Sequence, residues 1–339
     1  MKAAVFYGKN DVRVEERAIP AVREDDVLIR VHACGICGTD VHIFCGDEGA
    51  APTPPNTVLG HEFAGEVAAV GAHVTGISVG DPVCVDPNRL CGSCEFCRRG
   101  EGHFCTAITG IGTTVDGGFA EYCAVPSSQV YPVGNGVSYE QAAMAEPVSC
   151  CLHGIELCQI PRGGTVLIIG CGMIGLIMLQ LARLSGAARC IVIEPVEEKR
   201  KLALKLGADL ALDPAAGSVA ARLKASRLEQ IDTVIECVGR PETMEQAVSL
   251  AGKCSTVMLF GLTKADSTIR VRPFELFKKE ITLRSSYINP YTFPAAVNLI
   301  TGGKLDVTSM ICKTEPLSRL PAILADGKLR SAGKYILTM

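Results

Sequence analysis

The sequence predicts an α/β protein with two parts, a doubly wound parallel sheet and a smaller, irregular β-rich part. Three observations support this fold class. A strand, a glycine turn and an apolar helix follow one another at 165–185. Strand-like and helix-like segments then alternate to about residue 287, which is typical of a parallel sheet with crossover helices. The first 150 residues instead hold short apolar strands interrupted by Pro and Gly.

The composition is that of a globular protein. With 339 residues, 48% hydrophobic and 20% charged, the chain is long enough for two domains with substantial cores. A formal net charge of -3 gives no reason to expect nucleic acid or an acidic membrane as a partner. The longest uncharged apolar run, at 165–182, contains three glycines and is therefore not expected to span a membrane.

The cysteines indicate a reducing compartment. There are 17, an odd number spread over the whole chain, whereas disulfide scaffolds are short secreted chains with paired cysteines. The opening residues, MKAAVFYGKN, lack the apolar core of a secretion signal. We therefore expect reduced thiols and a cytoplasmic protein.

In the β-rich part, the chemistry lies in two motifs. We expect strands at 1–7, 26–35, 62–71 and 80–87. Between and beside them, Cys37, His61 and Glu62 offer a thiolate, an imidazole and a carboxylate. This mixed set suits an open catalytic zinc that keeps a position for water or substrate. Thr39 supplies a hydroxyl two residues from Cys37, and His42 could pass its proton to solvent.

Each of these residues has a simpler interpretation. A single histidine is more often a satisfied polar group than a ligand. Cys34 and Cys37 form a C-x-x-C pair that could be redox-active. No thioredoxin-like strand and helix pattern frames the pair, so we expect Cys34 to be buried packing.

Four more cysteines lie within fifteen residues, in the segment LCGSCEFCRRGEGHFC. Cys91, Cys94, Cys97 and Cys105 are separated by two, two and seven residues. Four reduced thiols can enclose one tetrahedral zinc ion, which is then closed to chemistry. An iron–sulfur cluster is the alternative, but the bacterial ferredoxin run has three residues before its fourth cysteine and a proline after it. Here there are seven, and Thr106 follows, so zinc is favoured.

The glycine turn predicts a dinucleotide site. Gly170, Gly172 and Gly175 form G-x-G-x-x-G between the strand at 165–169 and the apolar helix that follows. The three glycines make a tight turn, let backbone approach a pyrophosphate and let helix and strand pack closely. The helix N-terminus then supplies N–H groups for the phosphates.

The next strand, RCIVIEP, ends at Glu194, 19 residues after Gly175. A carboxylate there is expected to bind the adenosine ribose hydroxyls and to repel the 2′-phosphate of NADP, which favours NAD. Lys199 and Arg200 lie close by and weaken this argument.

The alternation continues with strand candidates at 208–213, 231–239, 254–262 and 280–287, and helices at about 196–206, 216–228 and 241–251. Ligands of such sheets bind beyond the carboxyl ends of the strands, here near Gly239, Gly261 and Leu262.

Together, the motifs resemble those of zinc-dependent medium-chain dehydrogenases. CGTDVH (37–42), GHEFAG with EVAAVG (60–71), the four-cysteine segment (91–105) and GCGMIG (170–175) occur in the family's order. The resemblance covers essentially the whole chain. It implies a GroES-like catalytic domain formed by 1–150 and 288–339, around a Rossmann NAD-binding domain at 151–287. It also implies a homodimer or homotetramer and two zinc ions per chain, one catalytic and one structural.

Within the family the chain resembles the polyol branch that includes sorbitol dehydrogenase, with threonine dehydrogenase nearby. Glu146, in AEPVSCCLHGIE, carries this resemblance, because the branch places a glutamate where ethanol-type enzymes have a second cysteine ligand. The resemblance implies that Glu146 acts at the catalytic zinc, directly or through water, with Glu62 exchanging on and off the metal. Cys150, four residues further on, is the alternative occupant of that position.

The resemblance also implies individual roles. Thr39 and His42 form a proton relay, and Asp40 orients the metal ligands. Ile174, Glu194 and Lys199 fall at positions that contact the cofactor. The expected reaction is hydride transfer from a secondary alcohol to NAD, with the zinc lowering the pKa of the alcohol.

The substrate is left open by the sequence. A polyol or sugar alcohol that yields a ketose is the first expectation. Threonine 3-dehydrogenation and oxidation of a sugar-alcohol phosphate are alternatives, and a non-catalytic redox sensor that binds zinc and NAD is a remote one. We expect pocket residues within 44–55, at Arg89 and within 288–293.

Overall fold

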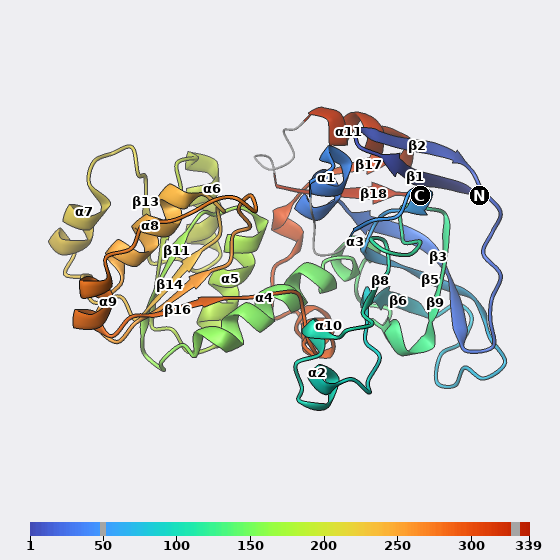
Figure 1. Cartoon of the computed structure of the whole chain (residues 1–339), viewed down its shortest axis with the longest axis horizontal. Coiled ribbons are helices and arrows are strands. Elements are labelled where there is room, and N and C mark those ends of the chain that lie inside the picture. The colour runs from blue at the N-terminus through green and yellow to red at the C-terminus, as the bar shows by residue number, and fades with distance from the viewer. Residues whose placement is uncertain (48–51, 327–332) are drawn as a thin grey trace. The chain divides into compact units, whose positions relative to one another are not determined.

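The computed structural model describes residues 1–47, 52–326 and 333–339. The chain folds as two compact units (Figure 1). The first comprises residues 1–149 and 289–339, and the second comprises residues 150–288. Among the described residues no helix is both long and apolar enough to cross a membrane.

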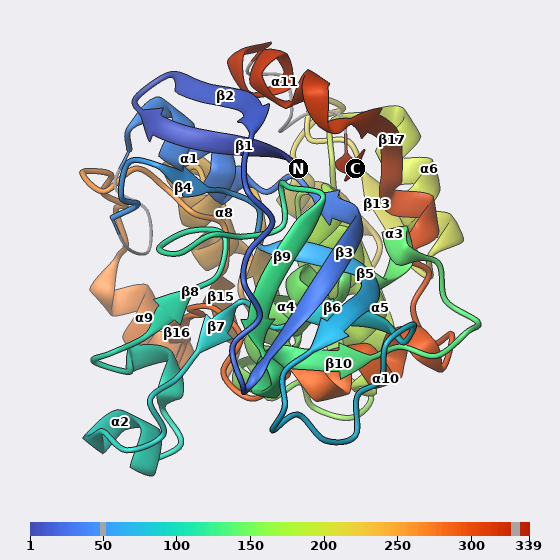
Figure 2. The ribbon, with the colours of Figure 1, turned by 90° about the vertical axis from the view of Figure 1, so that its right-hand side faces the viewer.

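A seven-stranded sheet forms the centre of the first unit (Figure 2). Its strands run in the order β10 (Val130–Pro132), β6 (Pro82–Val85), β5 (Glu62–Val70), β3 (Asp26–Gly35), β18 (Lys334–Thr338) and β17 (Ile311–Pro316), and β9 (Tyr122–Pro126) also pairs with β3. The pairs are antiparallel except β17 with β18. The last strand of the chain therefore lies beside β3, next to the segments that carry the N-terminal motifs.

The register of β3 decides what meets across this sheet. Gly35, the last residue of β3, lies opposite Glu62 on β5 and opposite Ile336 on β18. Apolar side chains along β3 and β5, including Ile29 and Phe63, are at most 1% exposed. Their burial pins the register, because a slip by one residue would turn these side chains to the opposite face.

The rest of the first unit consists of small sheets and short helices. A three-stranded sheet contains β2 (Asp11–Glu16), β1 (Lys2–Gly8) and β4 (Thr57–Val58), and a two-stranded one contains β7 (Asn88–Arg89) and β8 (Thr109–Gly110). The α-helices are α1 (Gly38–Cys45), α2 (Glu95–Arg98), α3 (Tyr139–Ala142), α10 (Phe293–Thr301) and α11 (Leu320–Asp326). The 3-10 turns are η1 (Gly102–Phe104), η2 (Ser127–Gln129), η3 (Thr308–Met310) and η4 (Leu317–Arg319).

The second unit holds a six-stranded, entirely parallel sheet. Its strand order is β13 (Leu210–Leu212), β12 (Arg189–Ile193), β11 (Thr165–Ile169), β14 (Thr233–Glu236), β15 (Thr256–Leu259) and β16 (Thr282–Ser285). Numbered within the unit this is 3-2-1-4-5-6, the doubly wound order. The predicted fold class is confirmed. Each strand predicted in this unit is present; β11 has the predicted bounds, and the others are shorter than predicted.

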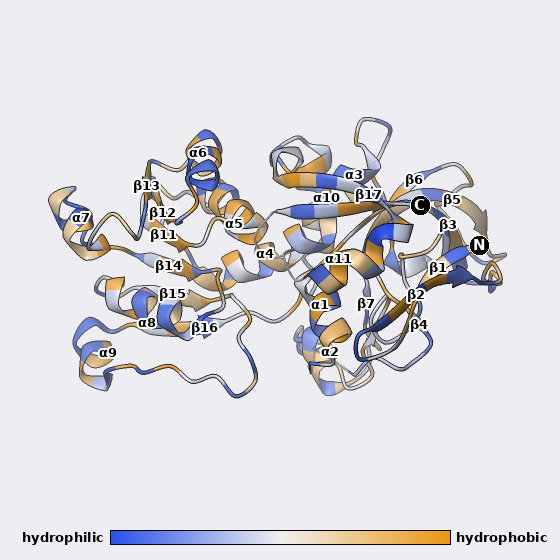
Figure 3. Ribbon diagram, turned by 90° about the horizontal axis from the view of Figure 1, so that it is seen from above, coloured by the Kyte–Doolittle hydropathy of each residue, from blue (hydrophilic) through white to orange (hydrophobic). Residues whose placement is uncertain are grey.

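Helices flank this sheet, and Figure 3 shows α5 and α6 on one side with α8 and α9 on the other. Their bounds are α4 (Ala145–Cys158), α5 (Met173–Leu184), α6 (Glu197–Lys205), α7 (Val219–Ala225), α8 (Pro241–Leu250) and α9 (Pro273–Lys279). Helix α9 is not predicted from the sequence. It has 7 residues, and its large aromatic side chains, Phe274 and Phe277, are 67% and 78% exposed, so its sequence does not show the apolar face of a buried helix. Helix α4 begins in the first unit and ends in the second.

Candidate active site

Cys37, His61 and Glu62 come together in the first unit. One ligand atom from each lies within 4.8 Å of the other two. Cys37 is the residue just before α1, while His61 and Glu62 stand at the start of β5. The pairing of β3 with β5 brings the two segments into contact, since Gly35 and Glu62 are register partners. The three residues that the sequence groups by chemistry are therefore neighbours in space.

Asp40 connects two members of this group. Its Oδ2 accepts a hydrogen bond from the backbone N–H of Cys37 at 2.8 Å, and its Oδ1 lies 3.5 Å from His61 Nδ1. Asp40 is fully buried and His61 is 6% exposed. A carboxylate at Nδ1 orients the imidazole and directs Nε2 toward a metal, as partners of metal-binding histidines do.

The surroundings of these groups fit a cation. Glu62 Oε1 is buried without a hydrogen-bond partner. Burial lowers the pKa of His61, but Asp40 and Cys37 raise it, and the net direction is well above its usual value. The surroundings of His61 therefore favour a positive charge. One sulfur, one nitrogen and one oxygen donor with a further position open match a catalytic zinc.

Thr39 and His42 lie one helical turn apart on α1. Thr39 Oγ1 is 3.6 Å from Cys37 Sγ, so its hydroxyl is beside the metal-binding group. His42 is partly buried, and its Nδ1 lies 3.0 Å from Asp47 Oδ2. Side chains three residues apart share a helix face. Thr39 therefore lies at the end of that face near Cys37, and His42 lies at the end near exposed Asp47.

Glu146 stands in the first turn of α4 and is 8% exposed. The Ser149 hydroxyl donates to its backbone carbonyl at 2.6 Å. Its carboxylate is not a member of the three-residue group, and neither is Cys150. A role for Glu146 at the metal stays a prediction.

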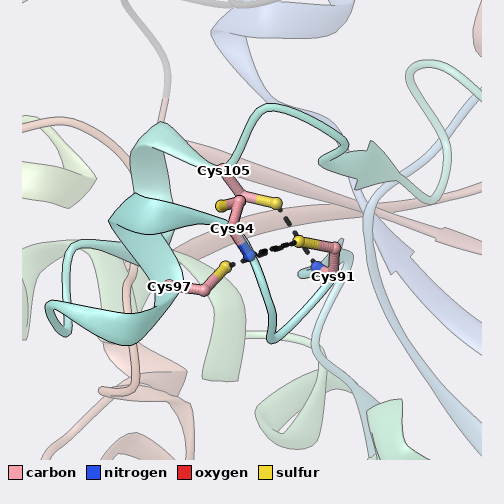
Figure 4. Close-up of side chains that lie close together, drawn as sticks. All are labelled: Cys91, Cys94, Cys97 and Cys105. Atoms are coloured by element: carbon pink, nitrogen blue, oxygen red, sulfur yellow. Dashed lines mark hydrogen bonds between the residues drawn. The ribbon is translucent and has the colours of Figure 1, made fainter.

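The four cysteines of the 91–105 segment form a second group, whose sulfur atoms all lie within 4.8 Å of one another (Figure 4). Cys91 Sγ and Cys97 Sγ are 3.9 Å apart. A tetrahedral zinc with bonds of about 2.3 Å requires sulfur atoms about 3.8 Å apart. Short α2 and η1 bring Cys97 and Cys105 round to meet Cys91, because the chain turns back on itself between them.

Backbone N–H groups stabilise a thiolate in the four-cysteine group. Those of Ser93 and Cys94 donate to Cys91 Sγ, at 3.5 and 3.3 Å, and they lower the pKa of Cys91 to about 6. Burial and the neighbouring thiols raise the pKa of Cys97 to about 12. Four thiolates this close need a cation to coexist, which fits a structural zinc.

The glycine turn of the second unit has the geometry of a dinucleotide site. Gly170 has φ 95°, a conformation that side chains rarely adopt. A Cβ at Gly172 would meet no atom within 4 Å, so its backbone is open to a ligand. A Cβ at Gly175 would overlap the carbonyl oxygen of Gly170, so only glycine allows α5 to pack against the turn. Ile174 follows Gly172 in the first turn of α5 and is partly buried.

Glu194 follows β12 and is 5% exposed. Its Oε2 accepts from the N–H of Cys171, inside the glycine turn, at 2.8 Å, and its Oε1 accepts from the N–H of Val196 at 2.9 Å. The carboxylate is thus fixed beside the turn. Lys199 is partly buried, and Arg200 forms an ion pair with Asp213 at 3.3 Å.

The loops beyond β14 and β15 also meet. A Cβ at Gly239 would overlap the carbonyl oxygen of Leu262, and one at Gly261 would overlap the N–H nitrogen of Gly239. Leu262 is 66% exposed. The predicted ligand-facing segments are therefore adjacent at the carboxyl edge of the sheet.

Comparison with known proteins agrees with both units. Residues 23–135 match the alcohol dehydrogenase GroES-like domain, and residues 174–302 match the zinc-binding dehydrogenase domain. D-arabinitol dehydrogenase 1 of Uromyces fabae is 32% identical over 91% of this chain and 88% of its own length. L-threonine 3-dehydrogenase of Caldanaerobacter subterraneus is 34% identical over 92% of this chain and 91% of its own.

The chain belongs to the zinc-dependent medium-chain dehydrogenases. A solved structure of a zinc-binding dehydrogenase from Sinorhizobium meliloti, bound to NADP, superposes with a TM-score of 0.95 at 35% identity and covers 100% of this chain and 99% of that one. This dehydrogenase is an oxidoreductase of small-molecule alcohols in the polyol branch, with zinc and a nicotinamide dinucleotide as cofactors.

Two residues of this dehydrogenase are not found by motif analysis. Lys334, 298 residues after Ile36, is buried against Glu62. Glu236 is fully buried, and its carboxylate accepts from the N–H groups of Val238 and Gly239 at 2.8 and 3.0 Å. An ionisable residue in a buried strand is the signal for Glu236. Lys334 has no such local signal, because only the sheet order brings it to the site.

Proposed function

We propose that this dehydrogenase oxidises a secondary alcohol, a polyol or sugar alcohol that yields a ketose, with NAD as hydride acceptor. The first compact unit serves as the catalytic domain and the second as the NAD-binding domain. The observation that carries the proposal is the group of partly buried Cys37 with buried His61 and Glu62, whose donors lie within 4.8 Å of one another.

Zinc held by Cys37, His61 and Glu62 would supply a Lewis acid that lowers the pKa of a bound alcohol. The chain's own residues then handle the proton. Thr39, whose hydroxyl is 3.6 Å from Cys37 Sγ, accepts it from the substrate and releases its own hydroxyl proton toward His42. His42, one turn further along α1, passes it toward solvent on the side of Asp47. Glu146, at the start of α4, is the further candidate at the metal, directly or through water, and it would alternate there with Glu62 so that one position stays open to substrate.

The preference for NAD rests on Glu194. Its carboxylate is held next to the glycine turn by the N–H of Cys171, and an acidic residue at this point of a dinucleotide-binding unit binds the adenosine ribose. A negative charge there repels a 2′-phosphate. Two basic residues, Lys199 and Arg200, oppose this effect. Arg200 is occupied with Asp213 and with the carbonyl of Glu194, at 2.7 Å, so its charge is partly offset.

Threonine is the second candidate substrate. The relative at 34% identity is an L-threonine 3-dehydrogenase, and the substrate is likewise a secondary alcohol. A polyol presents further hydroxyls and no charge, whereas threonine presents an ammonium and a carboxylate. Direct assay therefore separates the two.

The test is NAD reduction at 340 nm by zinc-loaded protein over a panel of polyols, sugar-alcohol phosphates, threonine and simple alcohols, with NADP in parallel. We expect turnover of one polyol group with NAD, lost on chelation and restored by zinc. Turnover of threonine alone would replace the substrate assignment. A zinc content of one ion per chain, with no turnover, would overturn the catalytic site.

We further propose a homo-oligomer, a dimer or tetramer. Strand β16 is the edge strand of the sheet in the second unit and pairs only with β15 among the described strands. Phe274 and Phe277 on adjacent α9 are 67% and 78% exposed. An open sheet edge beside exposed aromatics suits a second copy of the chain. Light scattering after chromatography should give a multimer, and Phe277→Asp should dissociate it.

The cellular compartment is also a proposal. No disulfide joins any of the 17 cysteines, all of which lie within the described residues. A chain with this many cysteines and no disulfide suits the reducing cytoplasm, which we propose as the location.

A further inference from the structure

Lys334 is a buried cation in direct contact with a candidate metal ligand. It is the first residue of β18 and 2% exposed. Its Nζ donates to the carbonyl oxygen of Ile36 at 3.1 Å and forms an ion pair with Glu62 Oε2. The Glu62 side chain is 1% exposed. Buried charges of this kind are rarely kept without a partner and a purpose.

The fold contains a space made for this pair. Strands β5, β3 and β18 are neighbours, and Gly35 lies on the central one, opposite Glu62 on one side and Ile336 on the other. A Cβ at Gly35 would overlap both Glu62 Oε2 and the Cε of Lys334. The ammonium and the carboxylate meet over the one position of β3 that has no side chain. The contact is therefore built by the sheet and does not depend on a flexible surface arm.

The two oxygens of Glu62 have different surroundings. Oε2 is taken by Lys334, whereas Oε1 is buried without a hydrogen-bond partner. Glu62 offers one carboxylate oxygen to the group with Cys37 and His61. If both oxygens turned to a metal, Cys37, His61 and a bidentate Glu62 would occupy four positions. The position that a catalytic zinc keeps open for substrate would then be filled.

We propose that Lys334 is a positioning residue that holds Glu62 by Oε2 and so limits it to one weak, exchangeable oxygen contact with the catalytic metal. The ammonium competes with the metal for the carboxylate. The metal therefore keeps an open position for substrate. This inference rests on the proposed catalytic zinc, and it adds a residue to that site that the sequence motifs do not contain.

The test measures metal binding instead of turnover. Lys334→Met removes the ammonium and keeps an unbranched side chain, while Lys334→Arg keeps the charge. Zinc affinity is measured by competition with a chromophoric chelator. The coordination number is followed in protein with cobalt at this site, because tetrahedral cobalt absorbs visible light more strongly than five-coordinate cobalt.

We expect Lys334→Met to bind the catalytic metal on the order of tenfold more tightly, with weaker cobalt bands. Lys334→Arg should resemble wild type. Adding Glu62→Gln to Lys334→Met should abolish both changes, because the freed ligand is then neutral. A merely structural role for Lys334 would lower stability without changing the cobalt spectrum.

The inference is overturned if Lys334→Met has the spectrum and affinity of wild type, or if Glu62→Gln does not reverse its effect. Should Lys334→Met not fold, Lys334→Gln replaces it, since glutamine can still donate to the Ile36 carbonyl without a charge. Failure of the proposed function is a separate result. In that case wild-type protein itself would bind no metal at Cys37 and His61.

Discussion

The carboxylate of Asp40 faces the imidazole of His61, with Oδ1 3.5 Å from Nδ1, and both residues are buried. The other oxygen of Asp40 accepts from the N–H of Cys37 at 2.8 Å. One side chain therefore contacts two of the three metal-binding residues. The geometry of the donors depends on it, although Asp40 itself offers no atom to the metal-binding group.

Asp40→Asn should weaken zinc binding at this site about 10- to 100-fold, the usual cost of losing a partner of a metal-binding histidine. The amide keeps the size of the side chain but loses the charge that orients His61. Chelator competition measures the effect. Asp25→Asn is the matched control, because Asp25 pairs with His73 at 3.2 Å on the surface. Equal affinities in the two variants would contradict the orienting role.

Thr39→Ala should lower kcat about 100-fold or more, because a positioned proton-transfer group typically contributes that much. The hydroxyl lies 3.6 Å from Cys37 Sγ and is lost without a change in the donors. Thr39→Ser, which keeps the hydroxyl, should retain most of the activity. Both variants should bind two zinc ions per chain. Full turnover by Thr39→Ala would remove Thr39 from the relay.

Much of this architecture is predictable from sequence because its signals are local. The run from Thr165 to Gly175 predicts a strand, a turn and the start of a helix. The spacing of Cys91, Cys94 and Cys97 predicts a metal-binding loop. Contacts of high sequence separation carry no such signal. Lys334 reaches Glu62 across 272 positions only because β18 pairs with β3. The hydrogen bond from the N–H of Cys171 to Glu194 likewise forms because β11 and β12 end side by side.

Glu194→Ala should change cofactor choice, not only cofactor affinity. In the proposed role, removing the carboxylate would remove contacts with the ribose hydroxyls of NAD and the repulsion of a 2′-phosphate. The ratio of kcat/KM for NAD to that for NADP should fall about tenfold or more, since one charged hydrogen bond contributes about 1.5–3 kcal/mol. Loss of the Cys171 contact alone would weaken both cofactors equally, and that result would limit Glu194 to a structural role.

Cys97→Ser should release one zinc ion per chain and lower the melting temperature. Its Sγ lies 3.9 Å from that of Cys91, and three thiolates do not close a tetrahedral site. The expected readouts are metal content, from two ions to one, and faster proteolysis within the 91–105 segment. Cys254→Ser, an exposed cysteine outside this group, should leave both unchanged. A second zinc retained by Cys97→Ser would refute the four-cysteine site.

The stability of the protein should depend on pH through Asp86. Burial raises the pKa of its carboxyl from 3.8 to about 6, although the N–H of Asn88 and the amide of Asn289 donate to it at 3.1 and 3.2 Å. Asn289 also donates to Ser149, whose hydroxyl holds the Glu146 carbonyl. The acid therefore belongs to a buried network behind the start of α4.

Because the folded-state pKa of Asp86 lies above its unfolded value, its contribution to stability is complete below about pH 3.8 and is lost as pH rises through about 6. Asp86→Asn keeps an oxygen acceptor and has no charge to bury. The stability of the variant relative to wild type should rise between pH 4 and 7, by up to about 3 kcal/mol. Unfolding of both proteins at equal zinc concentration measures this difference at each pH. Asp11→Asn, at an exposed carboxyl whose pKa Arg13 lowers, should show only a weak trend of the opposite sign. A flat difference for Asp86→Asn would mean that Asp86 is ionised in the folded protein at little cost, with its hydrogen bonds offsetting its burial.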